Sequence, residues 1–146
     1  MTLLHFEDFP VGRIFDCGSY PVSRDEVFEF ARAFDPQPHH LNEEAAKATI
    51  LGGLSASGWH VCAIAMRLFA DAIILKADNR GGAGARETRW MKPVRPGDVL
   101  RMEAEVMEAT ASKSKPFGFV TFDCRLFTAA GQVAIVSMTP IIGFKP

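Results

Sequence analysis

One segment limits the fold of this chain more than any other. Residues 58–75, GWHVCAIAMRLFADAIIL, are apolar on nearly every side when they are placed on a helix. A helix of this kind is normally buried on most of its sides. Its polar side chains, His60, Arg67 and Asp71, fall on one stripe, which fits a buried helix and argues against a membrane span. We therefore expect a long helix in the core of the protein.

The second half of the chain has the alternating pattern of half-buried strands. In residues 99–107 every second residue from Leu100 onward is apolar, and residues 117–127 alternate in the same way. Such alternation predicts antiparallel strands with one face on the core. The remaining predictions are strands at residues 12–20, 86–92 and 132–144, a bulge or an edge near Pro140, and a flexible loop at residues 76–85.

The first half of the chain carries helix signals instead. Ser23 is predicted to cap a helix, with Glu26 at the capping-box position. We expect this helix to end at Asp35, because the residue before a proline disfavours the helical region. Asn42 is predicted to cap a second, short helix with an acidic first turn, and residues 35–41 are expected to form a loop between the two. Helices followed by strands favour an α+β domain, with an antiparallel sheet of about five strands packed on the long helix.

Length and composition fit one domain, residues 1–146, without a nucleic-acid or membrane partner. The 16 basic and 17 acidic residues leave a net charge of −1, which gives neither a nucleic-acid footprint nor a polybasic membrane patch. The three cysteines are far apart, and the N-terminus lacks the basic start and apolar stretch of a signal peptide. We expect a cytoplasmic protein with buried thiols at Cys62 and Cys124.

The segment FDPQPHHLNEE, residues 34–44, holds the residues best suited to acid–base chemistry. The carboxylate of Asp35 and the imidazole of His40 could share this work, since one can hold or deprotonate a water molecule while the other delivers a proton. Pro36 and Pro38 restrict the backbone between them and would fix their relative positions. From the residues alone a structural role also stays open, with Asp35 ending a helix and His40 packing at its end.

Gly58 is a candidate oxyanion-binding residue. It begins the long helix, where the N–H groups of the first turn point outward at the positive end of the helix dipole, and a glycine there lets a substrate carbonyl approach. The alternative is that Gly58 only eases a tight turn into the helix. Ser55 and Ser57 lie just before it, but the GxSxG elbow of a serine nucleophile is absent.

The sequence gives no sign of a metal site. Adjacent side chains such as His39 and His40 diverge on most backbones, and no cluster of Cys, Asp or Glu lies at ligand spacing. We therefore expect neither a metal nor a cofactor, and we interpret His39 as a loop residue that takes no part in the chemistry.

Residues 34–71, FDPQPHHLNEEAAKATILGGLSASGWHVCAIAMRLFAD, resemble the signature of the MaoC-like, (R)-specific enoyl-CoA hydratase family. That family shows Asp-x-Asn-Pro-x-His, then an acidic-first helix, then a small-residue turn that ends in Gly. The matching positions here are Asp35, Gln37, Pro38, His40 and Gly58. The later RWMKPVRPGDVL resembles the family's Pro-Gly-Asp turn, and the resemblance extends from about residue 11 to the end.

The resemblance implies a fold, a reaction and an assembly. The fold is a single hotdog domain, in which the sheet wraps around the central helix, usually as a homodimer or a dimer of dimers. The reaction is addition of water to a trans-2-enoyl thioester, or dehydration of an (R)-3-hydroxyacyl thioester, carried by coenzyme A or another acyl carrier. Asp35 and His40 would bind and activate one water molecule, and the N–H of Gly58 would hold the thioester oxygen as it becomes enolate-like.

The chain departs from the family pattern at four positions. Gln37 replaces the Asn of the motif, Ser57 replaces the His of a His-Gly turn, and Asn42 replaces an acidic residue. Met66 aligns with a serine that some members carry near the pocket. We take Gln37, Ser57 and Met66 as candidate substrate-binding residues.

The residues leave two other functions open. A hotdog acyl-CoA thioesterase usually places its acid on the central helix, but the one acid there, Asp71, lies far from the N-terminal end where the substrate would sit. A non-catalytic acyl-CoA-binding hotdog protein would not need the Asp35–His40 pair. A basic run could meet the phosphates of coenzyme A, with plain surface charge as the alternative; it consists of Arg86, Arg89, Lys92 and Arg95.

Overall fold

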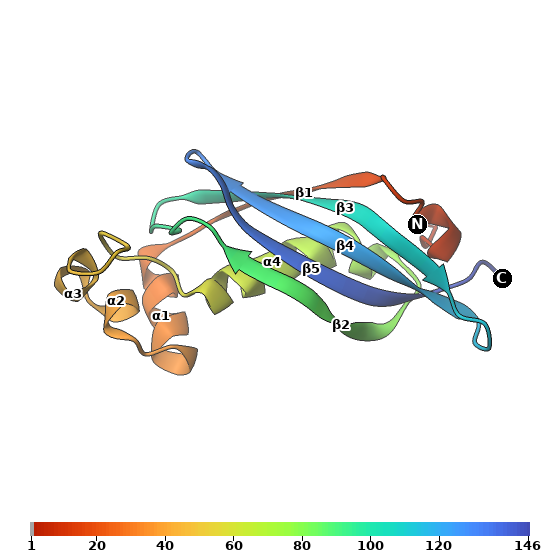
Figure 1. Ribbon diagram of the computed structural model, residues 1–146, viewed down its shortest axis with the longest axis horizontal. Helices are drawn as coiled ribbons and strands as arrows, with labels where there is room; N and C mark the ends of the chain where they lie inside the picture. Colours follow the sequence, from red (N-terminus) through yellow and green to blue (C-terminus); the bar gives the residue numbers. More distant parts are fainter. Residues whose placement is uncertain (1) are drawn as a thin grey trace.

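The computed structural model of the protein describes residues 2–146, which form one five-stranded sheet and a set of helices (Figure 1). The strands lie in the order β1-β3-β4-β5-β2, and all neighbours are antiparallel. Along the chain the elements are η1 (Phe6–Asp8), β1 (Ile14–Pro21), α1 (Arg24–Phe34), α2 (Pro38–Leu41), α3 (Glu43–Lys47), α4 (Gly58–Ala72), η2 (Ile74–Lys76), β2 (Asn79–Trp90), β3 (Val99–Ala111), β4 (Phe117–Thr128) and β5 (Gly131–Gly143).

The long apolar helix lies in the core, as its sequence predicts. The segment Gly58–Lys76, which comprises α4 and η2, could cross a membrane by length and composition. Here Ile64, Leu68 and Phe69 of α4 are buried in one core cluster with the sheet. Phe69 meets Phe122 of β4 edge to face, with ring centroids 5.0 Å apart. The regular helix ends at Ala72, three residues before the predicted end, and η2 completes the turn.

The alternation in the second half is confirmed. Every second residue of β3 from Leu100 to Val106 is fully buried, and so is every second residue of β4 from Val120 to Leu126. The β2–β5 pairing also shifts register next to the pair of Gly82 and Pro140, which is the irregularity that a proline in a strand predicts. Of the two cysteines predicted to be buried, Cys124 is buried and Cys62 is half-buried.

The predicted loop at residues 76–85 is wrong, because β2 starts at Asn79 and runs through the glycine-rich stretch to Trp90. Gly81 and Gly84 have φ values of 135° and 157°, and the ladder to β5 shifts register beside them. Glycine tolerates these conformations, so the strand continues where a side chain would strain it. The strand predicted at residues 86–92 is therefore the second part of β2, and the first part was missed because it lacks apolar side chains.

The loop predicted at residues 35–41 is also shorter than expected, since residues 38–41 form the single-turn helix α2. Pro38 occupies its first turn, where a missing N–H costs no hydrogen bond. With α1 and α3, this turn forms a small cluster at one end of the sheet, beside the first turn of α4 (Figure 1). Ser23 and Asn42 cap α1 and α3 through their side chains, as predicted.

His60 of α4 lies where α1 packs on α4. Its buried ring stacks on Phe30 of α1, with centroids 4.8 Å apart and an interplanar angle of 8°. Its Nε2 is 3.7 Å from the Glu26 carboxylate, too far for a hydrogen bond. The second half of the predicted capping box is not formed, because Glu26 accepts a 2.6 Å hydrogen bond from the Tyr20 hydroxyl instead. Burial lowers the pKa of His60 and outweighs the opposite pull of Glu26.

This burial predicts a pH dependence of stability. Because the pKa of His60 is lower in the folded protein than in the unfolded chain, the unfolded chain binds the proton first as the pH falls. The free energy of unfolding should therefore decrease between about pH 7 and about pH 5. His60→Phe keeps a ring against Phe30 and should flatten that decrease, as measured by urea denaturation at each pH. His5→Phe, remote from α1, should keep the wild-type slope; equal slopes in wild type and His60→Phe would contradict the prediction.

Candidate active site

The structure brings Asp35 and His40 together at the start of α4. Asp35 is the residue that ends α1, and His40 lies in α2, one short turn later. The distance from His40 Nε2 to Asp35 Oδ2 is 3.4 Å, and the two side chains are 7% and 13% exposed. The proximity predicted from their spacing is thus present, in a nearly buried setting where acid–base groups interact strongly.

Both oxygens of Asp35 accept hydrogen bonds from neutral side chains. The Ser57 hydroxyl donates to Oδ2 at 2.6 Å, and the Gln37 amide donates to Oδ1 at 2.6 Å. Burial by itself raises the pKa of Asp35, but these two donors, with the nearby His40 and His39 rings, more than offset it and hold the pKa below its ordinary value. Asp35 is therefore an ionised carboxylate at neutral pH.

The backbone fixes the orientation of the His40 ring. Nδ1 lies 2.8 Å from the carbonyl oxygen of Ser55. A carbonyl only accepts, so Nδ1 carries the proton in the neutral ring and Nε2 presents a lone pair. That lone pair faces the carboxylate of Asp35. Two acceptors that face each other suit a molecule with two O–H donors, and water is such a molecule.

A cavity of about 470 Å³ opens from this pair. Its polar end is formed by Asp35, Gln37 and His40, and Gly58 lies on its wall. The remaining lining is mainly apolar and includes Ile50, Leu51, Trp59, Val61, Trp90, Met91, Val94 and Val133. A pocket with a few converging polar groups and an apolar wall is typical of a small-molecule site.

Gly58 has a packing role that the sequence did not reveal. A Cβ at this position would lie 2.3 Å from Cε2 of Trp90, because the indole ring of that residue rests on the glycine. Trp90 also meets Trp59 edge to face, with centroids 5.2 Å apart. Gly58 is the first residue of α4 after the Ser57 cap, so its N–H has no acceptor within the helix. The geometry therefore fits both the oxyanion role and a steric need for glycine.

The other predicted residues divide into two groups. Gln37 and Ser57 both contact Asp35 directly, as described above. Met66 does not line this cavity; it is 47% exposed on α4 and borders a separate apolar cavity between α4 and β2. His39 packs against the His40 ring, with centroids 4.2 Å apart, and does not line the cavity either. Across residues 2–146, no group of three or more His, Cys, Asp or Glu side chains is arranged to hold a metal ion.

Sequence reasoning missed two contributors, the Ser55 carbonyl and Trp90. The first is a backbone carbonyl, and because every residue has one, the residue type does not show that this carbonyl contacts His40. The second is the last residue of β2 and lies within the strand predicted at residues 86–92, but its contact with Gly58 was not predicted. A glycine against a tryptophan would show only as a correlated pair, which a single sequence does not reveal.

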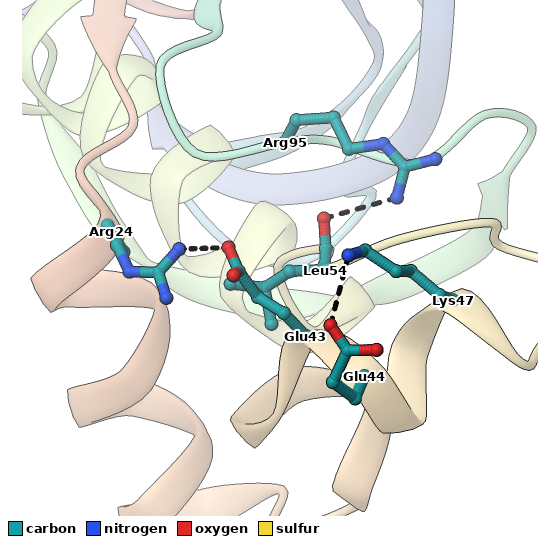
Figure 2. A network of polar contacts seen from close by, with 6 residues as sticks. All are labelled: Arg24, Glu43, Glu44, Lys47, Leu54 and Arg95. Atoms are coloured by element: carbon teal, nitrogen blue, oxygen red, sulfur yellow. Dashed lines mark hydrogen bonds and ion pairs between the residues drawn. The ribbon is translucent and has the colours of Figure 1, made fainter.

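The side chains of the basic run form ion pairs and hydrogen bonds with other groups of the protein. Arg86 pairs with Glu108, Arg89 pairs with Glu87, and Lys92 donates to the carbonyl of Ala130. Arg95 turns inward and donates to the carbonyl oxygen of Leu54 (Figure 2). It also donates to the carbonyl oxygen of Leu51. Surface charge and internal contacts therefore account for this run, and phosphate binding is not needed to explain it.

Three comparisons place the chain among known proteins. A MaoC-like dehydratase from Rhodospirillum rubrum is 39% identical with a TM-score of 0.91, over 98% of this chain and 99% of that one. Protein YdeM of Bacillus subtilis (strain 168) is 30% identical over 112 residues, 77% of this chain and 79% of YdeM. The (R)-hydratase PhaJ1 from Pseudomonas aeruginosa is 23% identical with a TM-score of 0.76, over 99% and 88% of the two chains, and shares the fold.

The five-stranded antiparallel sheet with its long central helix is a hotdog fold, as the sequence resemblance implied. The family model of the MaoC like domain matches residues 9–123, a span that contains both Asp35 and His40. The chain belongs to the MaoC-like family, whose structural relatives include dehydratases and (R)-hydratases.

The contact between Gly58 and Trp90 can be tested by a double-mutant cycle. Gly58→Ala should lower the free energy of unfolding by about 1–3 kcal/mol, because the new methyl group collides with the indole. In a Trp90→Ala background the same change should cost much less, since the colliding ring is gone. Urea denaturation of the four proteins measures both costs. Equal costs in the two backgrounds would show that the glycine is required for another reason.

Proposed function

We propose that the protein is a hydro-lyase that adds water to a trans-2-enoyl thioester, or removes it from an (R)-3-hydroxyacyl thioester. The observation that carries the proposal is the Asp35–His40 pair, in which a lone pair on Nε2 and an ionised carboxylate face each other at the polar end of a largely apolar cavity. Membership in the MaoC-like family supports the same reaction class.

The proposed chemistry assigns a separate task to each residue. Water is held between Asp35 and His40, and its oxygen attacks C3 of the enoyl group while Nε2 accepts one proton. Imidazole exchanges protons readily near neutral pH, whereas Asp35, with its lowered pKa, is the weaker base and stabilises the imidazolium that forms. The electrons of the double bond move to the thioester oxygen, which the Gly58 N–H stabilises at the positive end of α4. The proton then passes to C2, and the pair is restored.

The structure gives less support to the two alternative functions, a thioesterase and a non-catalytic binding protein, than to the hydro-lyase. The one acid on α4, Asp71, is an exposed residue and forms a 2.8 Å ion pair with Arg67. It does not line the cavity that contains Asp35, so the helix supplies no acid for a thioesterase reaction there. A purely binding protein would have no use for an ionised carboxylate opposite an imidazole lone pair, since both are costly to desolvate.

The assay with crotonyl-CoA separates the three functions. Asp35→Asn and His40→Ala should each lower the hydration rate by about 100-fold or more, because each removes one side of the water site. Loss of the enoyl absorbance without release of free thiol identifies hydration, and thiol release would identify hydrolysis. Circular dichroism should show both variants folded. A variant that retains near-normal turnover would contradict the mechanism, and a wild-type protein that binds without turnover would favour the binding function.

We further propose that two copies associate through β2 and the exposed side of α4. β2 is an edge strand, and eleven of its twelve residues are exposed, so its outer N–H and C=O groups are free to pair with another strand. Met66 of α4 borders the apolar cavity beside this strand. An antiparallel pairing of two copies of β2 would cover both features. The resulting dimer would act on acyl thioesters in the cytoplasm, a reducing compartment that suits its three free cysteines.

Light scattering tests this assembly. The wild-type protein should have twice the 16.0 kDa mass of one chain. Met66→Glu places a charge on the proposed contact and should shift the mass towards that of one chain. Val11→Glu adds the same charge at an exposed apolar residue beside the opposite edge strand, β1, and should leave the mass unchanged. A wild-type mass of one chain, or equal effects of the two variants, would exclude the proposed contact.

A further inference from the structure

Arg95 lies in the turn between β2 and β3, and its guanidinium points into the protein. It donates to the carbonyl oxygen of Leu54 at 3.1 Å (Figure 2). It also donates to the carbonyl oxygen of Leu51, and both leucines are far from Arg95 in the sequence. The backbone N–H of Arg95 donates to the carboxylate of Asp98 at 2.8 Å, and this hydrogen bond closes the turn in which Arg95 lies. One side chain thus ties two points of the segment before α4 to the turn before β3.

The segment that Arg95 holds is the one that orients the candidate catalytic pair. Leu54 precedes Ser55, whose carbonyl oxygen contacts Nδ1 of His40 at 2.8 Å. Ser57, two residues later, donates to Asp35. Between them, the N–H of Ala56 donates to the carbonyl of Val94, the residue before Arg95, at 2.8 Å. The partners of both His40 and Asp35 are therefore anchored to the same turn.

Arginine suits this position for a geometric reason. Its planar guanidinium presents several N–H donors in a fixed fork, so it reaches two carbonyl oxygens at once, whereas lysine offers one compact charge on a flexible stem. The backbone also closes around it, since a Cβ on Gly53 would lie 3.2 Å from Nη1 of Arg95. In residues 2–146 Arg95 has no carboxylate within ion-pair distance, unlike Arg86 and Arg89 of the same run.

We propose that Arg95 is a positioning residue for the Asp35–His40 pair. By fixing the carbonyl of Ser55, it keeps the proton of the His40 ring on Nδ1 and the lone pair of Nε2 directed at Asp35. The catalytic consequence rests on the proposed hydratase function; the effect on the His40 ring does not. The competing role for Arg95 is contact with a phosphate of coenzyme A.

Kinetics with two thioesters separate these roles. Crotonyl-CoA carries phosphates, and crotonyl N-acetylcysteamine thioester carries none. If Arg95 is a positioning residue, Arg95→Lys should lower kcat by about 10- to 100-fold on both substrates, with KM little changed. A loss confined to the KM of crotonyl-CoA would overturn the proposal in favour of phosphate contact. Arg89→Lys, which changes an exposed member of the same run, should leave both sets of constants near wild type.

A spectroscopic test does not depend on activity. Long-range ¹⁵N NMR of labelled histidine should show His40 of the wild-type protein protonated at Nδ1, and Arg95→Lys should produce a mixture of the two tautomers. Gly53→Ala pushes on the guanidinium without removing it and should act in the same direction, so it serves if the arginine variant does not fold. An unchanged His40 tautomer in both folded variants overturns the proposal. If the tautomer changes but the wild-type protein hydrates no thioester, the positioning role of Arg95 is supported and the proposed reaction is contradicted.

Discussion

Burial of α4 is the constraint on which the rest of the structure depends. The helix is apolar on most sides, so its stability requires a surface that covers it, and the alternating residues of β3 and β4 supply one. Once α4 lies across the sheet, its first turn is fixed at one end of the sheet, beside α1 and α2. The position of the candidate site is thus a consequence of core packing, since the site is assembled around that first turn.

The coupling between fold and chemistry is closest at Ser57. Its hydroxyl oxygen accepts the N–H of Trp59 at 3.2 Å and so caps α4, while its hydrogen is donated to Asp35 at 2.6 Å. One hydroxyl therefore begins the core helix and orients the carboxylate that ends α1. Serine can do both because it is a donor and an acceptor at once. Ser57, at the position where the family carries a histidine, is thus a hydrogen-bond donor to Asp35.

The sequence predicted those features that depend on local chemistry. Period-two alternation located β3 and β4, the capping residues located the starts of α1 and α3, and the Asp35–His40 spacing identified the pair. It failed where long-range contacts decide the structure. The glycine-rich half of β2 is held by its ladder to β5, and Met66 faces away from the pair because of where α4 lies. Arg95 has the residue type of a phosphate ligand, and only the path of residues 51–54 shows its real partners.

The substitution at Gln37 gains a physical meaning from the geometry. In the family motif this position is Asn, and here the longer amide reaches back two residues to donate to Oδ1 of Asp35. With Ser57 on the other oxygen, the carboxylate has a neutral donor on each side, which favours its charged form and lowers its pKa. A carboxylate stabilised in this way accepts a proton less readily. In the proposed reaction the base is therefore His40, and Asp35 would hold the water molecule and stabilise the imidazolium that forms.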